Sequence, residues 1–187
     1  MISFSIWDMV RHLVTGAGWT IVLSVIAFAL GGVMGLIVLF ARISPKAQLR
    51  ALGMTYIEFF QDTPLLMQFF LIFFGLALFG VDISPLAAAM LGLTFFTSAY
   101  LAEIWRGCVE ALPKGQWEAS ACLAMTRFEQ LRHVILPQAL RIAIPPTVGF
   151  SVQVVKGTAV ASIIGFVEIT KTGTMIANAT FRPLLVY

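Results

Sequence analysis

Residues 113–146 read PKGQWEASACLAMTRFEQLRHVILPQALRIAIPP, the longest charged passage in a chain that is otherwise dominated by apolar runs. Apolar residues recur in it at steps of three and four, the spacing of one face of an α-helix. They are Trp117, Ala121, Ala124, Phe128, Leu131 and Ile135. Pro113 precedes the pattern and Pro137 is expected to end it, so the spacing predicts one amphipathic helix over residues 113–137. Because such a helix is too polar to span a membrane, we expect it to dock onto a partner in the aqueous phase.

The composition of the whole chain is that of a membrane protein. Hydrophobic residues make up 59% of its 187 residues and charged residues only 11%, against roughly 25% charged residues in soluble domains. A soluble fold could not bury so much apolar surface. We therefore predict an all-α, polytopic bundle of membrane-spanning helices that forms a single domain over residues 1–187.

Four stretches are apolar and long enough to cross a bilayer, which requires about 20 residues. They cover about residues 19–41, 55–80, 84–105 and 142–167. The start of the second span stays open, because polar residues precede an uncharged run and Pro64 must bend or start a helix. Either the span begins near residue 51 and carries Glu58, Gln61 and Asp62 inside the bundle, or it begins at residue 63.

The sequence also allows predictions for the segments that flank these spans and for two features within them. Residues 1–18 are expected to form a separate interfacial helix, and the residues after Glu168 an ordinary polar stretch. Pro145 and Pro146 suit the first turn of the fourth span, where backbone donors are unpaired. In the first span, Ala27, Gly31 and Gly35 form a ridge of small residues that another helix could approach closely. We expect this ridge to pack within the subunit, with a contact to another subunit as the alternative.

Positive charge is distributed unequally between the two sides of the predicted bundle. The side with the amphipathic helix carries eight basic residues, namely Arg42, Lys46, Arg50, Arg106, Lys114, Arg127, Arg132 and Arg141. The other side carries Arg11, Lys171 and Arg182. Because basic residues concentrate in cytoplasmic loops, we expect a cytoplasmic amphipathic helix and an N-terminus on the outside.

The inventory of reactive residues argues against an enzyme. The chain contains no Gly-Lys pair, and so no phosphate-binding loop of the Walker type. His12 and His133 fall on opposite sides of the membrane, so neither a zinc site nor a nucleophile–histidine pair is predicted, and no cofactor is expected. Cys108 and Cys122 lack metal-ligand spacing and are expected to be reduced thiols facing the cytosol. Any energy that drives the protein must therefore come from a partner.

Lys156 is the strongest signal within a predicted span. It lies near the middle of residues 142–167, where a cation costs roughly 2.5–3.5 kcal/mol on insertion scales. Gly157 beside it weakens the helix and leaves carbonyl groups free to line a path. Two interpretations stay open: Lys156 and Thr158 help to form a solute path, or Lys156 forms a structural ion pair or extends toward the interface.

Several motifs resemble one family of membrane proteins. Glu118-Ala119-Ser120, followed by Ile135-Leu136-Pro137, resembles the EAA loop in permease subunits of bacterial ABC importers. The stretches TPLLMQ (residues 63–68), AYLAEIWRG (99–107), KGQWEAS (114–120) and VILPQALR (134–141) resemble the branch that takes up polar amino acids. The chain departs from the family pattern at four places: Ser120 replaces an alanine, Ala124 a glycine, Gln61-Asp62 an Arg-Gly pair, and Gly157 an acid.

The resemblance implies the fold of an ABC type I importer permease, with a fifth span expected after Tyr187. It implies translocation of a polar amino acid across the bacterial inner membrane, with ATP hydrolysis on two separate cytoplasmic ATP-binding subunits. The further partners it implies are a second permease subunit, identical or homologous, a periplasmic or lipid-anchored solute-binding protein, and membrane lipid, but no nucleic acid. The residues expected to couple to the ATPase are Glu118, Ala119, Ser120, Ala124, Leu136 and Pro137.

The candidates for the substrate path are Lys156, Thr158, Thr63, Pro64, Asp62 and Glu103. Asp62 and Glu103 are also the possible acidic partners of Lys156, with an interfacial charge as the alternative for each. The alternative function is a self-contained secondary transporter or channel that uses Lys156 and Asp62 as an ion relay. That alternative would need more spans, ideally in inverted repeats, and the sequence has no internal repeat.

Overall fold

The computed structural model describes residues 5–186, and in that range the chain consists of helices joined by turns. Three helices are long and apolar enough to cross a membrane: α1 (Ile6–Arg42), α5 (Pro85–Glu110) and the continuous run Arg127–Ile164. A fourth crossing exists if α2 (Ala47–Asp62) and the helix Leu65–Leu78 count as one bent span. The predicted all-α membrane bundle is confirmed.

Two of these helical runs are made of several elements. The helix Leu65–Leu78 consists of α3 (Leu65–Phe70), the π-helical turn η1 (Leu71–Gly75) and α4 (Leu76–Leu78). The run Arg127–Ile164 consists of α7 (Arg127–Glu129), the π-helical turn η2 (Gln130–Ile135), α8 (Leu136–Thr158) and the 3₁₀ segment η3 (Ala159–Ile164). α6 (Lys114–Cys122) precedes α7, and α9 (Ile169–Thr180) and α10 (Pro183–Val186) follow η3.

α1 is one continuous helix of 37 residues, so the prediction of a separate interfacial helix over residues 1–18 is wrong. Residues 1–4 of that prediction lie outside the described residues. No proline interrupts the segment, and Gly16 and Gly18 are tolerated within a strongly apolar helix. At ~1.5 Å per residue the helix is about 55 Å long, which exceeds a bilayer core of roughly 30 Å.

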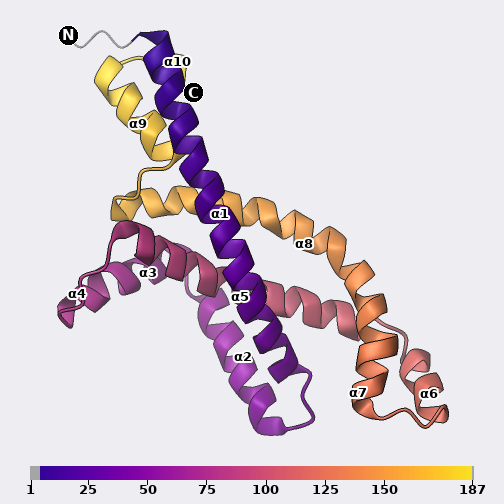
Figure 1. Ribbon diagram of the computed structural model, residues 1–187. Helices are drawn as coiled ribbons and strands as arrows, with labels where there is room; N and C mark the ends of the chain where they lie inside the picture. The colour runs from indigo at the N-terminus through magenta and orange to yellow at the C-terminus, as the bar shows by residue number, and fades with distance from the viewer. Residues whose placement is uncertain (1–4, 187) are drawn as a thin grey trace.

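The small-residue ridge of α1 packs against α5 within the subunit, as expected. A Cβ added at Gly31 would come within 2.7 Å of the Thr97 Cβ, and one at Gly35 within 3.1 Å of the Ser98 carbonyl oxygen. Figure 1 shows α1 crossing α5 at this point. The two helices approach so closely because neither glycine has a side chain.

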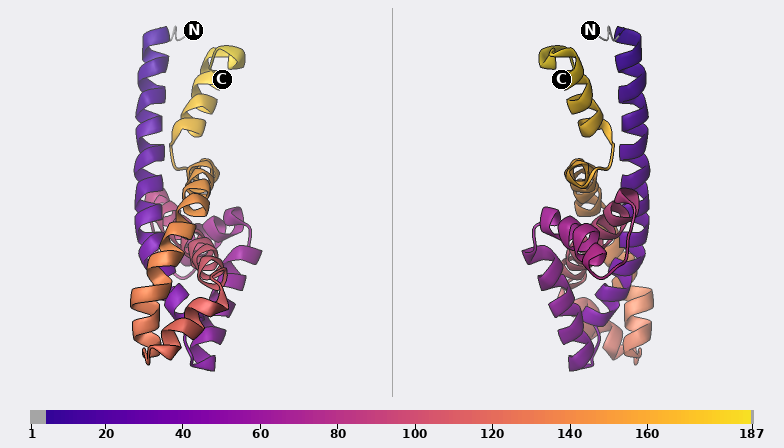
Figure 2. Two further views of the ribbon diagram at one scale, coloured as in Figure 1. Left: turned by 90° about the vertical axis from the view of Figure 1, so that its right-hand side faces the viewer. Right: turned by 90° about the vertical axis from the view of Figure 1, so that its left-hand side faces the viewer.

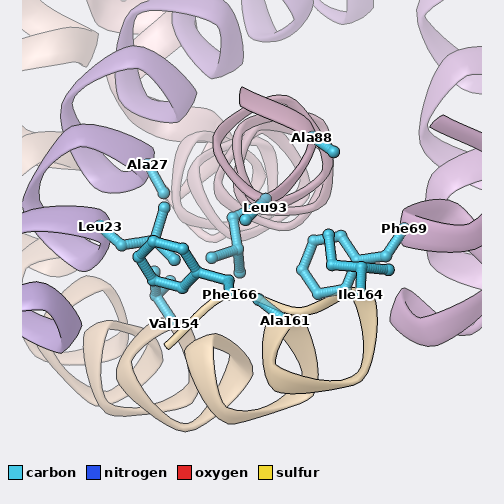
Figure 3. Packing of buried hydrophobic residues seen from close by; sticks show 10 residues of the cluster. Leu23, Ala27, Phe69, Ala88, Leu93, Val154, Ala161, Ile164 and Phe166 are labelled. Carbon is cyan, nitrogen blue, oxygen red and sulfur yellow. The ribbon is translucent and has the colours of Figure 1, made fainter. Parts of the chain in front are cut away.

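The core joins four helices around a cluster of buried residues (Figure 3). Leu23 and Ala27 of α1, Phe69 of α3, Leu93 of α5 and Val154 of α8 are each at most 1% exposed. This cluster holds α3 against α5 and α8.

The helix that contains the predicted fourth span begins earlier than expected, at Arg127, and Pro137 does not interrupt it. The run from Arg127 continues through η2 into α8, and Figure 1 shows it curving. The wider π-helical turn accommodates Pro137, whose missing amide would otherwise leave an α-helical bond unmade. Pro145 and Pro146 therefore lie inside α8 rather than in its first turn, which is a correction of the sequence-based expectation.

The residues after Glu168 are also different from the expected polar stretch, because they form α9, which packs beside α1. Figure 2 shows α9 next to the N-terminal half of α1, at the opposite end of the molecule from α6 and α7. Glu168 is fully buried at the start of α9. One end of the molecule is thus formed by the N-terminal half of α1 packed against α9, and the other end includes α6 and α7.

Candidate functional site

The stretch predicted as one amphipathic helix is a helical hairpin, residues 114–135, so the single-helix prediction is wrong. α6 ends at Cys122, and Ala124 adopts the left-handed backbone conformation with φ of 57°. The Met125 amide donates to the Ser120 carbonyl at 3.3 Å, and the Ala124 amide donates to the Ala121 carbonyl at 2.9 Å. This pair of bonds is the Schellman motif, which usually has glycine at the left-handed position.

The second arm of the hairpin begins with a capping box at Thr126. The Thr126 amide donates to Glu129 Oε2 at 2.8 Å, and the Glu129 amide donates to Thr126 Oγ1 at 3.4 Å. The arms are joined by the Arg127 guanidinium, 5.8 Å from the centre of the Trp117 ring. These contacts make the hairpin a defined unit rather than a loose loop.

A small hydrophobic cluster anchors the hairpin to the membrane helices. It consists of Val109, Leu112, Ile135 and Ala139, with Ile43, Trp117, Leu131, Val134 and Leu136 packed against it. Its members come from the end of α5, from α8 and from the turn after α1. The hairpin is therefore packed against the adjoining ends of several long helices.

The residues predicted to couple to a partner are partly exposed and partly structural. Glu118, Ala119 and Ala124 are exposed near the tip of the hairpin, and Pro137 is exposed at the start of α8. Ser120 is only 3% exposed and donates its hydroxyl to the Trp117 carbonyl at 2.9 Å. Leu136 packs against the anchoring cluster.

Two large apolar side chains are exposed on the hairpin surface, on either side of the turn. Leu123, which the sequence analysis missed, is 77% exposed, and Phe128, which it placed on the apolar face of a single helix, is 69% exposed. The sequence did contain a signal, because Thr126 and Glu129 have the spacing of a capping box and mark a helix start. The exposed tip thus combines two large apolar side chains with the carboxylate of Glu118.

A second candidate site lies at the break in the second span. α2 and Leu65–Leu78 meet at an angle of 100° around Thr63 and Pro64. The side-chain amide of Gln68 donates to the carbonyls of Phe60 at 2.8 Å and Thr63 at 2.9 Å. Gln68 is 3% exposed, and its Oε1 has no hydrogen-bond partner among the described residues. Gln68 therefore fixes the bend and leaves one buried acceptor unused.

The helix break packs directly on the C-terminal end of α8. A Cβ added at Gly157 would come within 3.2 Å of Leu65 Cδ2 and 3.0 Å of Leu93 Cδ2. Thr158 is 1% exposed and donates its hydroxyl to the Val155 carbonyl at 2.8 Å. The structure thus brings the segment around Thr63 and Pro64 close to the segment around Lys156 and Thr158.

One face of α8 next to this contact is polar and lined with small residues. Pro145, Gly149, Gln153 and Lys156 follow at steps of four, four and three, and all four are exposed. Within residues 5–186, the Gln153 and Lys156 side chains make no hydrogen bond or ion pair. Gln153 was missed by the sequence analysis, although its position three residues before Lys156 was visible.

The two acidic candidates differ in their surroundings. Glu103 is bound to Arg106, whose Nε donates to Glu103 Oε2 at 2.9 Å, and Arg106 also pairs with Glu110. Glu103 is therefore part of an ion-pair network along α5 and does not pair with Lys156. Asp62 is exposed at the end of α2 and forms no ion pair in the described part of the chain.

Glu168 is a buried carboxylate that the sequence analysis did not single out. Its oxygens accept from the amides of Thr170 at 2.9 Å and Lys171 at 2.7 Å, at the N-terminus of α9. The Thr20 hydroxyl of α1 lies 3.5 Å from Glu168 Oε2 and accepts from the Ile169 amide at 3.2 Å. These donors and the helix dipole stabilise the charge, and the arrangement ties α9 to α1.

The sequence matches one protein family over most of its length. Residues 31–186 match the family of binding-protein-dependent transport system inner membrane components. The chain is 35% identical over 185 residues to the L-cystine transport system permease protein TcyB of Bacillus subtilis (strain 168), covering 96% of this chain and 79% of TcyB. It is 35% identical over 185 residues to the glutamine transport system permease protein GlnP of Escherichia coli (strain K12), covering 98% of this chain and 84% of GlnP.

Solved structures share the fold. A crystal structure of an amino acid ABC transporter with histidines superposes with a TM-score of 0.91 at 32% identity, covering all of this chain and 88% of that chain. A structure of the MetNI methionine ABC transporter in an inward-facing conformation gives a TM-score of 0.69 at 20% identity, covering all of this chain and 94% of that one. The second similarity concerns the fold alone.

Proposed function

This chain belongs to the family of binding-protein-dependent transport system inner membrane components, and from that membership we propose that it is the permease subunit of an ATP-driven importer for a polar amino acid. It crosses the bacterial inner membrane several times, with the N-terminus outside and the hairpin in the cytoplasm. The relatives, an L-cystine and a glutamine permease, support a polar amino acid as the solute. They support this function over a self-contained secondary transporter.

The hairpin, residues 114–135, is the contact with a cytoplasmic ATP-binding subunit, of which the importer has two. The observation that carries this proposal is the exposed hairpin surface, where Leu123 and Phe128 present apolar surface at the turn and Glu118 is exposed on α6. A helical element with large exposed apolar side chains suits insertion into a groove of a partner protein. Because the hairpin is anchored to α5, α8 and the turn after α1, closure of the ATP-binding subunits would shift the inner ends of these helices.

The solute path runs along the polar face of α8, past the helix break. Lys156 and Gln153 would line it, together with Thr63 and Pro64 at the break. Thr158 is buried and would support the path by stabilising α8 through its hydrogen bond to the Val155 carbonyl. In the first turn of the helix that begins at Leu65, the Met67 and Gln68 amides donate to the Pro64 carbonyl at 2.9 and 3.2 Å, and the helix dipole favours an anion at this end. A solute carboxylate would therefore be attracted to this helix end and to Lys156.

The importer needs further subunits. A second permease subunit, identical or homologous, would face the exposed side of α8, where Lys156 and Gln153 lack partners within the described residues. A periplasmic or lipid-anchored binding protein would deliver the solute from outside. Asp62, exposed at the end of α2, is the acidic residue available to the path, whereas Glu103 is held by Arg106.

The experiment is reconstitution. The permease, co-expressed with its ATP-binding subunit, is incorporated into proteoliposomes, and uptake of radiolabelled polar amino acids is measured with binding protein and ATP. We expect co-purification of the ATP-binding subunit and uptake that requires both ATP and binding protein. Uptake by the permease alone, driven by an ion gradient, would instead establish a secondary transporter.

A further inference from the structure

A lateral groove opens between the inner ends of α1, α5 and α8, apart from the proposed solute path. It has a volume of about 440 Å³. Its floor is formed by Ala139 and Ala143, which are 4% and 7% exposed, and its rim includes Leu36, Phe40 and Ile144, which are 44%, 49% and 56% exposed. The small floor residues create the groove, and the large rim residues border it.

Within residues 5–186, the lining of the groove contains only two side chains with hydrogen-bonding groups, and these two are bonded to each other. The polar groups in its lining are the Trp105 indole and the Thr147 hydroxyl, and the indole N–H donates to Thr147 Oγ1 at 2.9 Å. A polar ligand would lose its hydration there without compensation. The occupant must therefore be apolar over the length that the groove covers.

The shape of the groove favours a thin occupant over another helix. A helix with its side chains is about 10–12 Å across, and close approach of two membrane helices requires small residues at the contact. The exposed rim of Leu36, Phe40 and Ile144 would hold such a helix away from the alanine floor. A flexible hydrocarbon chain can enter between these side chains.

A cation next to the groove indicates which lipid supplies this chain. Arg141 is exposed on α8, between the groove residues Leu140 and Ala143. The ion pairs among residues 5–186 all use Arg106, so Arg141 has no carboxylate partner there. An arginine in this position attracts the headgroup of an anionic lipid.

We propose that the groove binds one acyl chain of an anionic phospholipid of the inner leaflet, with the lipid phosphate at Arg141. The assignment to the inner leaflet rests on the proposed function, which places the hairpin next to the groove in the cytoplasm. Val109, Leu136 and Ala139 line the groove and also belong to, or pack against, the cluster that anchors the hairpin. The bound chain therefore supports the base of the hairpin from the membrane side.

The test uses quenching of tryptophan fluorescence by brominated acyl chains. The importer complex with Trp7→Phe and Trp19→Phe retains Trp105 within the membrane helices, and it is reconstituted with brominated phosphatidylglycerol or brominated phosphatidylcholine. We expect phosphatidylglycerol to quench at a mole fraction about fivefold lower, the preference that one arginine near the membrane surface provides. Arg141→Gln should remove this preference, and Ala143→Phe, which fills the groove, should remove the specific quenching.

The control is Val33→Phe, an enlargement at a position of α1 that is 63% exposed and outside the groove lining; it should leave the preference unchanged. Equal quenching by both lipids in the unsubstituted protein would mean ordinary annular lipid and overturn the proposal. No quenching by either lipid would mean that a protein subunit covers the groove, and would also overturn it. The assay requires no uptake, so its outcome is separate from that of the reconstitution above.

Discussion

Leu65, the first residue of α3, lies against Gly157 of α8, so that a Cβ added at Gly157 would come within 3.2 Å of Leu65 Cδ2. Leu93 of α5 approaches the same position to 3.0 Å. Three helices therefore meet at a residue without a side chain. A shift of α8 would displace the helix break at Thr63 and Pro64, which makes this contact a link between the two parts of the proposed solute path.

Gly157→Ala should lower the stability of the protein. The added methyl group would force Leu65 and Leu93 apart, and overpacking of this kind costs about 1–3 kcal/mol. The better helix propensity of alanine offsets up to about 1 kcal/mol of this destabilisation. We expect a lower midpoint of thermal unfolding in detergent. The control is Gly18→Ala, where nothing lies within 4 Å of the added Cβ; an unfolding midpoint that changes alike in both variants would contradict the packing argument.

Ala124→Gly should stabilise the hairpin. Ala124 has φ of 57°, a conformation that costs an alanine roughly 1–2 kcal/mol and a glycine far less. Slower cleavage of the hairpin by a protease in the detergent-solubilised permease would measure the gain. Ala121→Gly, in the helical part of α6, is the matched control and should accelerate cleavage. If both substitutions accelerate it, the left-handed turn is not the source of strain.

Much of the fold could be predicted from the sequence, because a bilayer imposes simple requirements on length and polarity. The uncharged runs over residues 19–41 and 83–102 had to become spanning helices. The errors concern helix continuity, which depends on tertiary packing. Pro137 could be accommodated only because η2 widens the helix, and the turn at Ala124 follows from a left-handed residue that periodicity does not reveal.

The sequence identified several residues of the candidate sites but not the way in which they are arranged in space. Lys156 was identifiable because a charge within an apolar run is rare, and the hairpin region because it is polar. The contact of Gly157 with Leu65 joins segments far apart in the sequence, and nothing local encodes it. Glu168 was missed for the same reason, since its burial depends on Thr20 of α1 and on the helix that begins after it.

Glu118→Lys should weaken association with the ATP-binding subunit. Glu118 is exposed on the hairpin, so charge reversal changes the proposed docking surface without affecting membrane insertion. We expect a loss of roughly tenfold in affinity, or about 1.4 kcal/mol, measured by titration of the purified ATP-binding subunit. Arg11→Glu reverses a charge near the N-terminus of α1, at the end of the molecule opposite the hairpin, and should leave the affinity unchanged. Undiminished association of Glu118→Lys would exclude this part of the hairpin from the contact.

The two cysteines should report the orientation of the chain. Both are expected on the cytoplasmic side, so a membrane-impermeant maleimide added to intact spheroplasts should label neither, whereas it should label a cysteine introduced by Asp82→Cys in the outer turn. After permeabilisation, Cys122 should react readily because it is exposed, and Cys108 slowly because it is buried. Mass spectrometry of the labelled peptides gives the measurement. Labelling of Cys122 in intact spheroplasts would reverse the proposed topology.

Lys156→Met should abolish most transport while leaving the protein inserted and folded. The substitution keeps an unbranched side chain and removes a charge from the middle of a span, which lowers the cost of insertion. Lys156 has no ion-pair partner within residues 5–186, so its removal leaves no carboxylate of this subunit unpaired. A loss of uptake would therefore reflect the missing attraction for the solute or for a partner subunit.

We expect uptake by the reconstituted importer to fall about tenfold or more, equivalent to about 1.4 kcal/mol, at solute concentrations below saturation. Lys156→Arg should retain part of the uptake, since it keeps the charge, and Lys46→Met, in the turn after α1, should retain all of it. Co-purification with the ATP-binding subunit serves as the check that assembly is intact. Unchanged uptake of Lys156→Met at every solute concentration would mean that this charge is merely tolerated, and would remove Lys156 from the solute path.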